Sequence, residues 1–303
     1  MTIEPLPGLC PSAFVHPVDR KTLAVLRSAP GIETAIKALM NVSIEDQFLY
    51  HQNQTAIRLG RNQYRSLYKM VEDAAAILDT PMPEVFLDTG YVINAYAFGF
   101  KRFAIVLPSG TVDFLNDDQL RAVIGHEVGH IACEHMMYKT MAELLRMAGD
   151  QAVGGLLGSA GFVVTASLRL ALLKWSRAAE FSCDRAALLV VRDPEVVAST
   201  LCSLAGRSSR FSSEFSLEAV LAQSEQAQQE AGLYASVTDF IRQSQLTHPD
   251  PVSRARAILE WSRSEEYAAI IDGRYPRRSG TREADRPSGV ELDWEVDSED
   301  AEL

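Results

Sequence analysis

The feature that most constrains this chain is a pair of histidines four residues apart in a strongly helical stretch. Asn116-Asp117-Asp118 is a predicted helix cap, and helical periodicity runs from Gln119 to about Met147. Within it, the run His126-Glu127-Val128-Gly129-His130 places both imidazoles on one face, because an α-helix has 3.6 residues per turn. Two such imidazoles can bind one metal ion, with any remaining ligands supplied by an element packed against this face. The alternative for the motif alone is a helix with two solvated or core histidines.

A second motif lies about fifty residues downstream, on a predicted helix from Lys174 to Arg192. A catalytic zinc takes three protein ligands and keeps one position open, and Glu180 can be the third ligand. Asp184, one turn further on the same face, can accept the free N–H of a ligand histidine and so fix its tautomer. The alternative is a surface pair of carboxylates bound to Arg177 or Arg185.

The same residues can be compared with the motifs of other metal sites. A metzincin would have a glycine three residues after His130 and a histidine three residues further, but this chain has Cys133 and Met136 there. His135 lies roughly 140° around the helix from His130 and should face away from the metal. We therefore expect it to be a structural histidine or a partner of a ligand. Cys133 and Cys183 are predicted to be small buried packing residues.

Composition limits the class of partner and the compartment. The net charge of −11 argues against nucleic acid, although much of it comes from an acidic C-terminal run. The four cysteines form no CxxC pair, which favours a reducing compartment. The first residues show neither the basic region nor the apolar run of a secretory signal, so we expect a cytoplasmic protein.

The remaining pattern predicts a mostly helical α+β protein. Residues 1–60 read as an N-terminal helical extension, and Arg61 to Leu78 as a further helix. Glu84 to Leu87 and Phe103 to Leu107 are short apolar runs typical of strands in a small sheet. Residues 273–303 are expected to form a disordered acidic tail.

The stretch 151–168 carries no charge, which raises the question of a membrane span. A single span here would separate His126 from Glu180, which must touch one ion, so we expect none. The open alternatives are a buried glycine-rich hairpin, or a segment that lies on a membrane or on a partner surface.

These residues resemble peptidase family M48, a family of gluzincins that includes the CAAX prenyl proteases, HtpX and BepA. The two motifs above are similar to those of the family, and two further segments agree. Asn94-Ala95-Tyr96-Ala97-Phe98 is similar to the family's Asn-Ala-x-Ala segment, and His248-Pro249 with Arg254 is similar to its His-Pro-x-x-x-x-Arg element.

The resemblance implies a thermolysin-like metallopeptidase core, here residues 61–272. It implies a substrate that adds as a strand to the sheet edge, for which Phe103 to Leu107 is the expected strand, with Asn94, Ala95 and Arg254 as substrate-binding residues. His248 either stabilises the oxyanion or approaches the zinc and blocks it. A helix-capping turn with a solvated histidine is the alternative.

Together these inferences predict a zinc metalloendopeptidase that cleaves protein or peptide substrates with one Zn²⁺ per chain. His126, His130 and Glu180 are the expected ligands, and Glu127 is the expected general base. The polar segment Gly206 to Gln245 is a candidate lid that keeps the resting enzyme inactive. A zinc-stabilised binding or chaperone-like module with silenced peptidase activity is the alternative.

Overall fold

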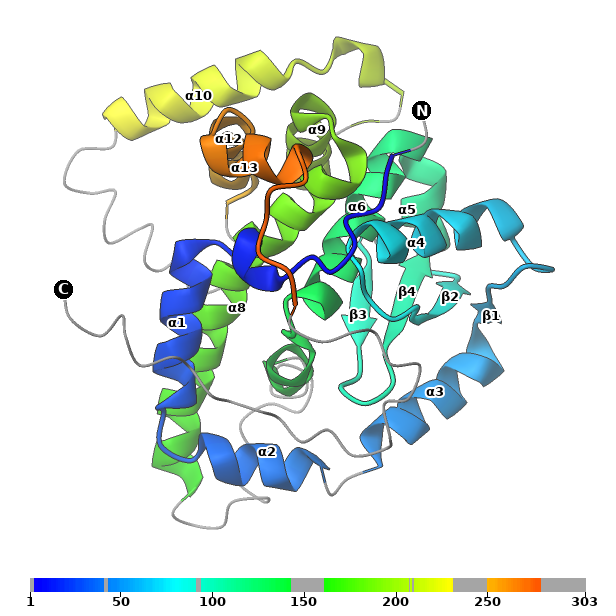
Figure 1. Ribbon diagram of the computed structural model, residues 1–303, viewed down its shortest axis with the longest axis vertical. Coiled ribbons are helices and arrows are strands. Elements are labelled where there is room, and N and C mark those ends of the chain that lie inside the picture. The colour runs from blue at the N-terminus through cyan, green and yellow to red at the C-terminus, as the bar shows by residue number, and fades with distance from the viewer. Residues whose placement is uncertain are drawn as a thin grey trace.

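The computed structural model describes residues 3–40, 43–90, 94–142, 161–206, 208, 210–230 and 250–278. They form a mostly helical α+β protein with one four-stranded sheet (Figure 1), which confirms the predicted fold class. The helices are η1 Pro11–Ala13, α1 Pro17–Arg27, α2 Ile32–Met40, α3 Ile44–Thr55, α4 Arg65–Ile77, α5 Ser109–Phe114, α6 Asp117–Ala132, α8 Gly161–Val191, α9 Pro194–Ala205, η2 Ser212–Glu214, α10 Leu217–Glu230, α12 Pro251–Trp261 and α13 Glu265–Ile271.

Helix α6 begins as predicted but ends earlier. A capping box forms at its start, where the Asn116 side chain accepts from the backbone of Gln119 and the Gln119 side chain accepts from the backbone of Asn116. The predicted continuation to Met147 is wrong, because Glu134 adopts a left-handed conformation with φ of 59° and stops the helix after Ala132. A separate helical stretch follows at 136–142.

Two glycines let α6 and α8 approach each other closely. A Cβ on Gly129 would lie 2.7 Å from the Cβ of Ala186, and one on Gly125 would lie 3.0 Å from the Cβ of Val190. Such close contacts cannot be relieved by rotating a side chain when both atoms are Cβ atoms. The two helices therefore cross at backbone distance, which carries the middle of α8 against the histidine face of α6.

The sheet has the order β1-β2-β4-β3, with strands Ile57–Arg58, Glu84–Asp88, Ala104–Pro108 and Tyr96–Phe98 in that order. Strand β4 runs parallel to β2 and antiparallel to β3, and it is buried along its whole length. The expectation that Phe103 to Leu107 forms the sheet edge is therefore wrong. The chain turns back at Gly99, where φ is 103°, and β3 takes the edge position.

Both faces of the sheet are covered. Side chains that alternate along β2 and β4 pack on opposite sides: Val85 and Ile105 join the main core with α4 and α6, whereas Phe86 and Val106 pack with Leu49 of α3. Helix α1 lies along α8 (Figure 1). The first sixty residues thus supply a cover for the sheet and a brace for α8.

The two ends of the described chain meet on the surface of α6. Leu9 pairs with Arg277 in an antiparallel bridge, the Cys10 N–H donates to the Pro276 carbonyl at 3.0 Å, and the Arg278 N–H donates to the Gly8 carbonyl at 2.8 Å. Described structure therefore continues to Arg278, inside the predicted tail. Residues 279–303 and 151–160 lie outside the described residues.

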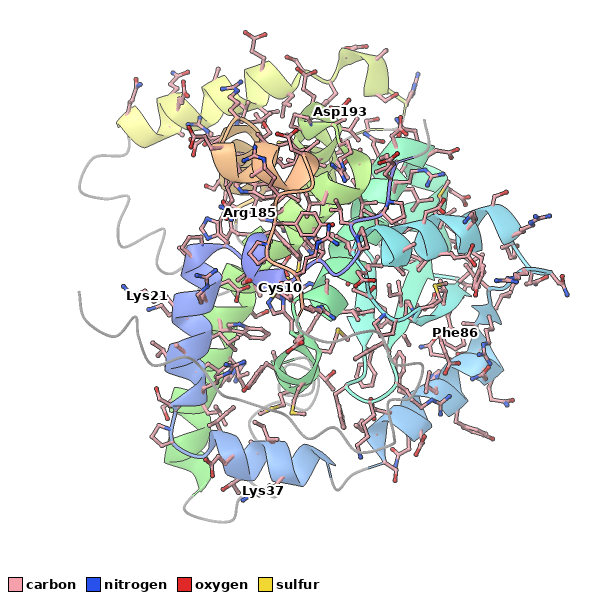
Figure 2. The ribbon with its side chains drawn as sticks, in the orientation of Figure 1. Cys10, Lys21, Lys37, Phe86, Arg185 and Asp193 are labelled. Carbon is pink, nitrogen blue, oxygen red and sulfur yellow. The ribbon has the colours of Figure 1, made fainter. Side chains whose placement is uncertain are left out.

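Arg185 fastens α8 to both ends of the chain (Figure 2). Its Nη1 donates to the Phe14 carbonyl at 3.2 Å and lies 3.3 Å from Glu266, while its guanidinium stacks 4.7 Å from the centre of the Trp261 ring.

Among the described helices, none is long and apolar enough to cross a membrane.

We predict that Gly129→Ala destabilises the protein by about 1–3 kcal/mol, the usual cost of overpacking a tight core. The clash must outweigh the roughly 1 kcal/mol by which alanine is favoured over glycine in a helix. Gly206→Ala is the matched control, because a Cβ there meets nothing within 4 Å. Urea unfolding of both variants measures the effect, and equal stability of Gly129→Ala and wild type would contradict this packing.

A second prediction concerns the C-terminal end. Removing residues 279–303 should leave the melting temperature almost unchanged, because their composition cannot bury enough apolar surface to fold. Truncation after Asp272 should lower it, since the backbone bonds of Pro276 and Arg278 are lost, each worth about 0.5–1.5 kcal/mol. Equal melting temperatures of the two truncated proteins would show that residues 273–278 contribute nothing.

Candidate active site

The two motif helices bring three side chains together. Nε2 of His126 lies 3.4 Å from Oε2 of Glu180, and Nε2 of His130 lies 3.5 Å from Oε1 of the same carboxylate. His126 and His130 project from one face of α6, and Glu180 comes from α8 across the glycine contact. Glu180 and His130 are almost completely buried.

Behind this group, a buried ion pair orients His126. The Arg254 side chain, from α12, donates through Nε and Nη2 to the two oxygens of Asp184 at 2.7 and 2.6 Å. Oδ1 of Asp184 lies 3.0 Å from Nδ1 of His126. Because an ionised carboxylate only accepts, Nδ1 of His126 carries the proton in this bond. The alternative in which Glu180 and Asp184 pair on the surface is excluded by their burial.

Arg254 was expected to bind substrate. The structure places its guanidinium against two carboxylates, since Nη1 also lies 3.1 Å from Oε2 of Glu180. Its side chain is buried, and it also lines the cavity described below. The substrate-binding role remains a prediction, whereas the contacts show Arg254 holding Asp184 and Glu180 in place.

The two histidines differ in protonation. Burial alone would lower the pKa of His126, but the charges of Glu180 and Asp184 outweigh it and raise that pKa to about 9. Burial, followed by the charge of Lys139, holds the pKa of His130 well below its usual value. His130 is therefore neutral at physiological pH, whereas His126 is protonated beside the two carboxylates and would have to release a proton to bind a metal.

Nε2 of His130 fits a metal ligand in another respect. It is buried and makes no hydrogen bond with any described residue. Buried polar atoms are almost always hydrogen-bonded, so one without a partner points to a missing ligand.

Two residues of α8 could complete a three-ligand set. The side chains of His126, His130 and Cys183 have ligand atoms within 4.8 Å of one another, which forms a possible His-His-Cys metal group. Glu180 has one oxygen within 3.5 Å of each histidine. These short contacts with both imidazoles favour Glu180 over Cys183 as the third ligand.

Glu127 faces the edge strand. Its Oε2 accepts the backbone N–H of Ala97 at 2.8 Å and the ammonium of Lys139 at 3.0 Å. Both bonds use the same oxygen, so Oε1 makes no hydrogen bond with the residues that the structure describes. Sequence reasoning missed Lys139, because the helix break at Glu134 changes the face on which it would lie.

A cavity of about 310 Å³ adjoins these residues. Its lining includes His126, Glu127, Glu180 and Arg254, and the expected substrate residues Asn94 and Ala95 lie on its wall. The backbone of Asn94 is fixed by Thr111, whose hydroxyl accepts its N–H at 2.8 Å and donates to its carbonyl at 2.7 Å. His248 lies outside the described residues.

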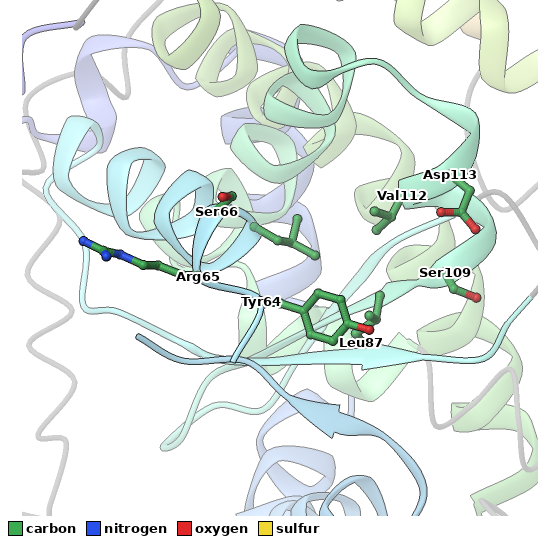
Figure 3. Close-up of a pocket in the computed structure, with 8 residues that line it drawn as sticks. Tyr64, Arg65, Ser66, Leu87, Ser109, Val112 and Asp113 are labelled. Carbon is green, nitrogen blue, oxygen red and sulfur yellow. The ribbon is translucent and has the colours of Figure 1, made fainter. Parts of the chain in front are cut away.

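A second cavity, of about 420 Å³, contains none of the expected site residues (Figure 3). Tyr64, Arg65 and Ser66 line one side of it, and Val112 and Asp113 of α5 line another. Helix α5 therefore contributes to both cavities, since Thr111 lines the first.

Comparison with known proteins identifies the family of the chain. The family model described as "Peptidase family M48" matches residues 61–262, which include both motif helices. A plastoglobule-localized metallopeptidase 48 of Arabidopsis thaliana is 35% identical over 263 residues, which cover 85% of this chain and 74% of that protein. A protease HtpX homolog of Streptococcus pneumoniae serotype 19F is 38% identical over 84 residues, covering 27% of this chain and 28% of that protein. No solved structure matches the chain.

The family match spans about two thirds of the chain, and the Arabidopsis relative extends the similarity across most of it. The residues matched by the family model include His126, His130, Glu180 and Asp184. The chain belongs to peptidase family M48 and is a metalloprotease.

Proposed function

We propose that this protein is a zinc-dependent endopeptidase that binds one Zn²⁺ per chain through His126, His130 and Glu180. The observation that carries the proposal is the buried Nε2 of His130, which lacks a hydrogen bond and faces a carboxylate shared with His126. Zinc bound there would supply Lewis-acid polarisation of the scissile carbonyl. Cys183 supports the packing of α8 on α6, where its Cα lies 3.2 Å from the Cβ position of Gly129.

Glu127 acts as the general base in this proposal. The Ala97 N–H and Lys139 hold one carboxylate oxygen, which fixes the orientation of the side chain. The other oxygen, Oε1, can then take a proton from the attacking water and deliver it to the leaving amine. An intact base disfavours the alternative of a silenced binding module, because a structural metal site has no use for one.

The substrate pairs with the edge strand β3 at its N-terminal end. In an antiparallel pair, backbone groups point alternately toward the partner strand and away from it. Ala97 points its N–H away from β4, toward Glu127, so the groups of Ala95 also face outward. Thr140 covers both the N–H and the carbonyl of Gly99 at 3.3 and 3.4 Å. Ala95 also lines the cavity beside Glu127, so its outward-facing backbone groups mark the place where a peptide strand would add.

Three expectations from the sequence remain proposals. His248 stabilises the oxyanion or blocks the metal in a resting state, with Gly206 to Gln245 as a lid. For residues 151–160 a buried hairpin and contact with a membrane or a partner surface are the two proposals, whereas residues 161–168 begin α8 and Leu168 is buried in the core. The enzyme is cytoplasmic and acts on proteins or peptides, although the similar Arabidopsis protein is plastoglobule-localized.

We expect about one zinc per chain in protein purified without added metal. His126→Ala and Glu180→Ala should lose it, because a three-ligand site cannot spare a ligand. Cys183→Ala is the matched control on the same helix and should retain it. Elemental analysis of the four proteins gives the counts. Loss of zinc in Cys183→Ala with retention in Glu180→Ala would replace the third ligand by the cysteine.

We expect Glu127→Gln to retain zinc and the wild-type fold while its activity falls by at least about 10²- to 10⁴-fold, the usual contribution of a general acid–base group. Glu134→Gln, an exposed glutamate beside the same helix, is the control and should cleave normally. Cleavage of unfolded casein, followed by the release of new amino termini, measures turnover. Wild-type rates in Glu127→Gln would refute the assigned role, and zinc without cleavage in wild type would favour the binding module.

A further inference from the structure

A second carboxylate lies behind the metal ligands, on the N-terminal helix α1. Asp19 is completely buried, yet its two oxygens accept from three side chains. Trp175 donates through Nε1 to Oδ1 at 3.1 Å, Ser182 donates through its hydroxyl to Oδ2 at 2.6 Å, and Nε2 of His135 lies 2.9 Å from Oδ2. Burial alone would raise the pKa of Asp19, but His135 and the two other donors outweigh it and lower that pKa. Asp19 is therefore an ionised carboxylate inside the protein.

His135 connects this carboxylate to a proposed ligand. Its other ring nitrogen, Nδ1, lies 3.4 Å from Nδ1 of His130. The early end of α6 makes this contact, because the His135 N–H donates to the His130 carbonyl at 3.0 Å and the ring folds back. His135 thus contacts the ring nitrogen of His130 that faces away from the proposed metal position, in line with the expectation of a structural histidine or a partner of a ligand.

The direction of the hydrogen bonds follows from the chemistry of the three groups. An ionised carboxylate has no proton to give, so Nε2 of His135 must donate to Asp19. With its proton on Nε2, a neutral His135 presents Nδ1 as an acceptor, and two groups face it: Nδ1 of His130 at 3.4 Å and Sγ of Cys183 at 3.7 Å. A thiol is the weaker donor, so we infer that Nδ1 of His130 gives the hydrogen bond. Nε2 of His130 is then left as a bare lone pair, and this is the buried atom that has no hydrogen-bond partner.

We propose that Asp19 is a positioning residue that sets the tautomer of His130 through His135, so that the Nε2 lone pair of His130 faces the metal. The inference rests on the proposed function in one respect, namely that His130 is a zinc ligand. Asp19 comes from a segment before residue 61, where the family match begins. The N-terminal helix therefore supplies part of the metal centre.

A carboxylate is required at position 19, and an amide of the same shape is not equivalent. In the Asp19→Asn variant, the new amide could turn its NH₂ toward Nε2 of His135. His135 would then carry its proton on Nδ1 and donate to His130, which would move the His130 proton to Nε2 and cover the metal-facing lone pair. Loss of an outer partner of a metal-bound histidine typically weakens metal binding by about 10- to 100-fold.

The wild-type protein tests the proposal directly. The full-length chain, labelled with ¹⁵N in its six histidines, is studied by long-range ¹H–¹⁵N correlation NMR with and without zinc. We expect His135 to be protonated on Nε2 alone in both states, and zinc-free His130 to be protonated on Nδ1. A proton on Nδ1 of His135, alone or with one on Nε2, would overturn the proposal.

Two variants distinguish a positioning role of Asp19 from a purely structural role. Asp19→Asn should bind zinc about 10- to 100-fold more weakly in competition with a chelator. Ser182→Ala removes a different hydrogen bond to the same carboxylate and leaves that of His135, so it should lower the melting temperature but keep the zinc affinity and the tautomers. Equal zinc affinities in the two variants would show that Asp19 has only a structural role.

The outcomes also separate this inference from the proposed function. If the chain bound no zinc at His130 but showed the expected tautomers, the hydrogen-bonded chain from Asp19 through His135 to His130 would be supported and the ligand assignment would be wrong. If zinc and proteolysis were confirmed while His135 was protonated on Nδ1, only the proposed role of Asp19 would be wrong.

Discussion

The proposed metal centre depends on the close crossing of α6 and α8 at Gly125 and Gly129. The histidines at 126 and 130 follow these glycines by one residue, so the face that contacts α8 and the face that presents the imidazoles are neighbours on the same helix. A Cβ at Gly129 would lie 2.7 Å from the Cβ of Ala186, so the helix backbones would have to move apart, whereas the neighbours of a Cβ at Gly125 would have to give by a few tenths of an ångström. Separation of the two helices would move Glu180 away from both imidazoles. The packing of α6 on α8 therefore sets the distance between the two histidines and the proposed third ligand.

Two hydrogen-bonded chains of side chains, here called arms, reach this crossing, and each contains a buried carboxylate. One runs from Arg254 through Asp184 to His126, and the other from Asp19 through His135 to His130. They come from opposite ends of the described chain, α12 and α1, and both end on α6. Each arm buries charge, which is costly unless the charge is paired and hydrogen-bonded. A buried pair that loses one partner destabilises the fold, so the same contacts that orient the imidazoles also secure the terminal helices on the core.

The sequence predicts the site residues that lie in local helical motifs. It does not predict the residues whose position depends on contacts with distant parts of the chain. Helical spacing put His126 and His130 on one face, and Glu180 and Asp184 one turn apart, and the structure brings these four together. Asp19 gave no local signal, because its partners lie more than a hundred residues away along the chain. The sheet edge was misplaced because a three-residue strand such as β3 carries too little pattern to be recognised, whereas β4 has the continuous apolar run of a fully buried strand. The resemblance assigned Arg254 to substrate binding, and only the structure shows that its guanidinium binds Asp184.

The short break at residues 133–135 explains three features that periodicity could not foresee. Had α6 continued to Met147, His135 would face away from His130, and Lys139 and Thr140 would extend past the sheet. Because Glu134 takes a left-handed conformation, the stretch 136–142 turns across the end of β3 instead. Thr140 then covers Gly99 and Lys139 reaches Glu127, while His135 folds back onto His130. One backbone conformation therefore positions Glu127, the proposed general base, covers the end of the edge strand at Gly99 and links α1 to the proposed ligand His130. A residue other than glycine adopts it at a cost of about 1 kcal/mol or more, which the contacts made by His135, Lys139 and Thr140 must offset.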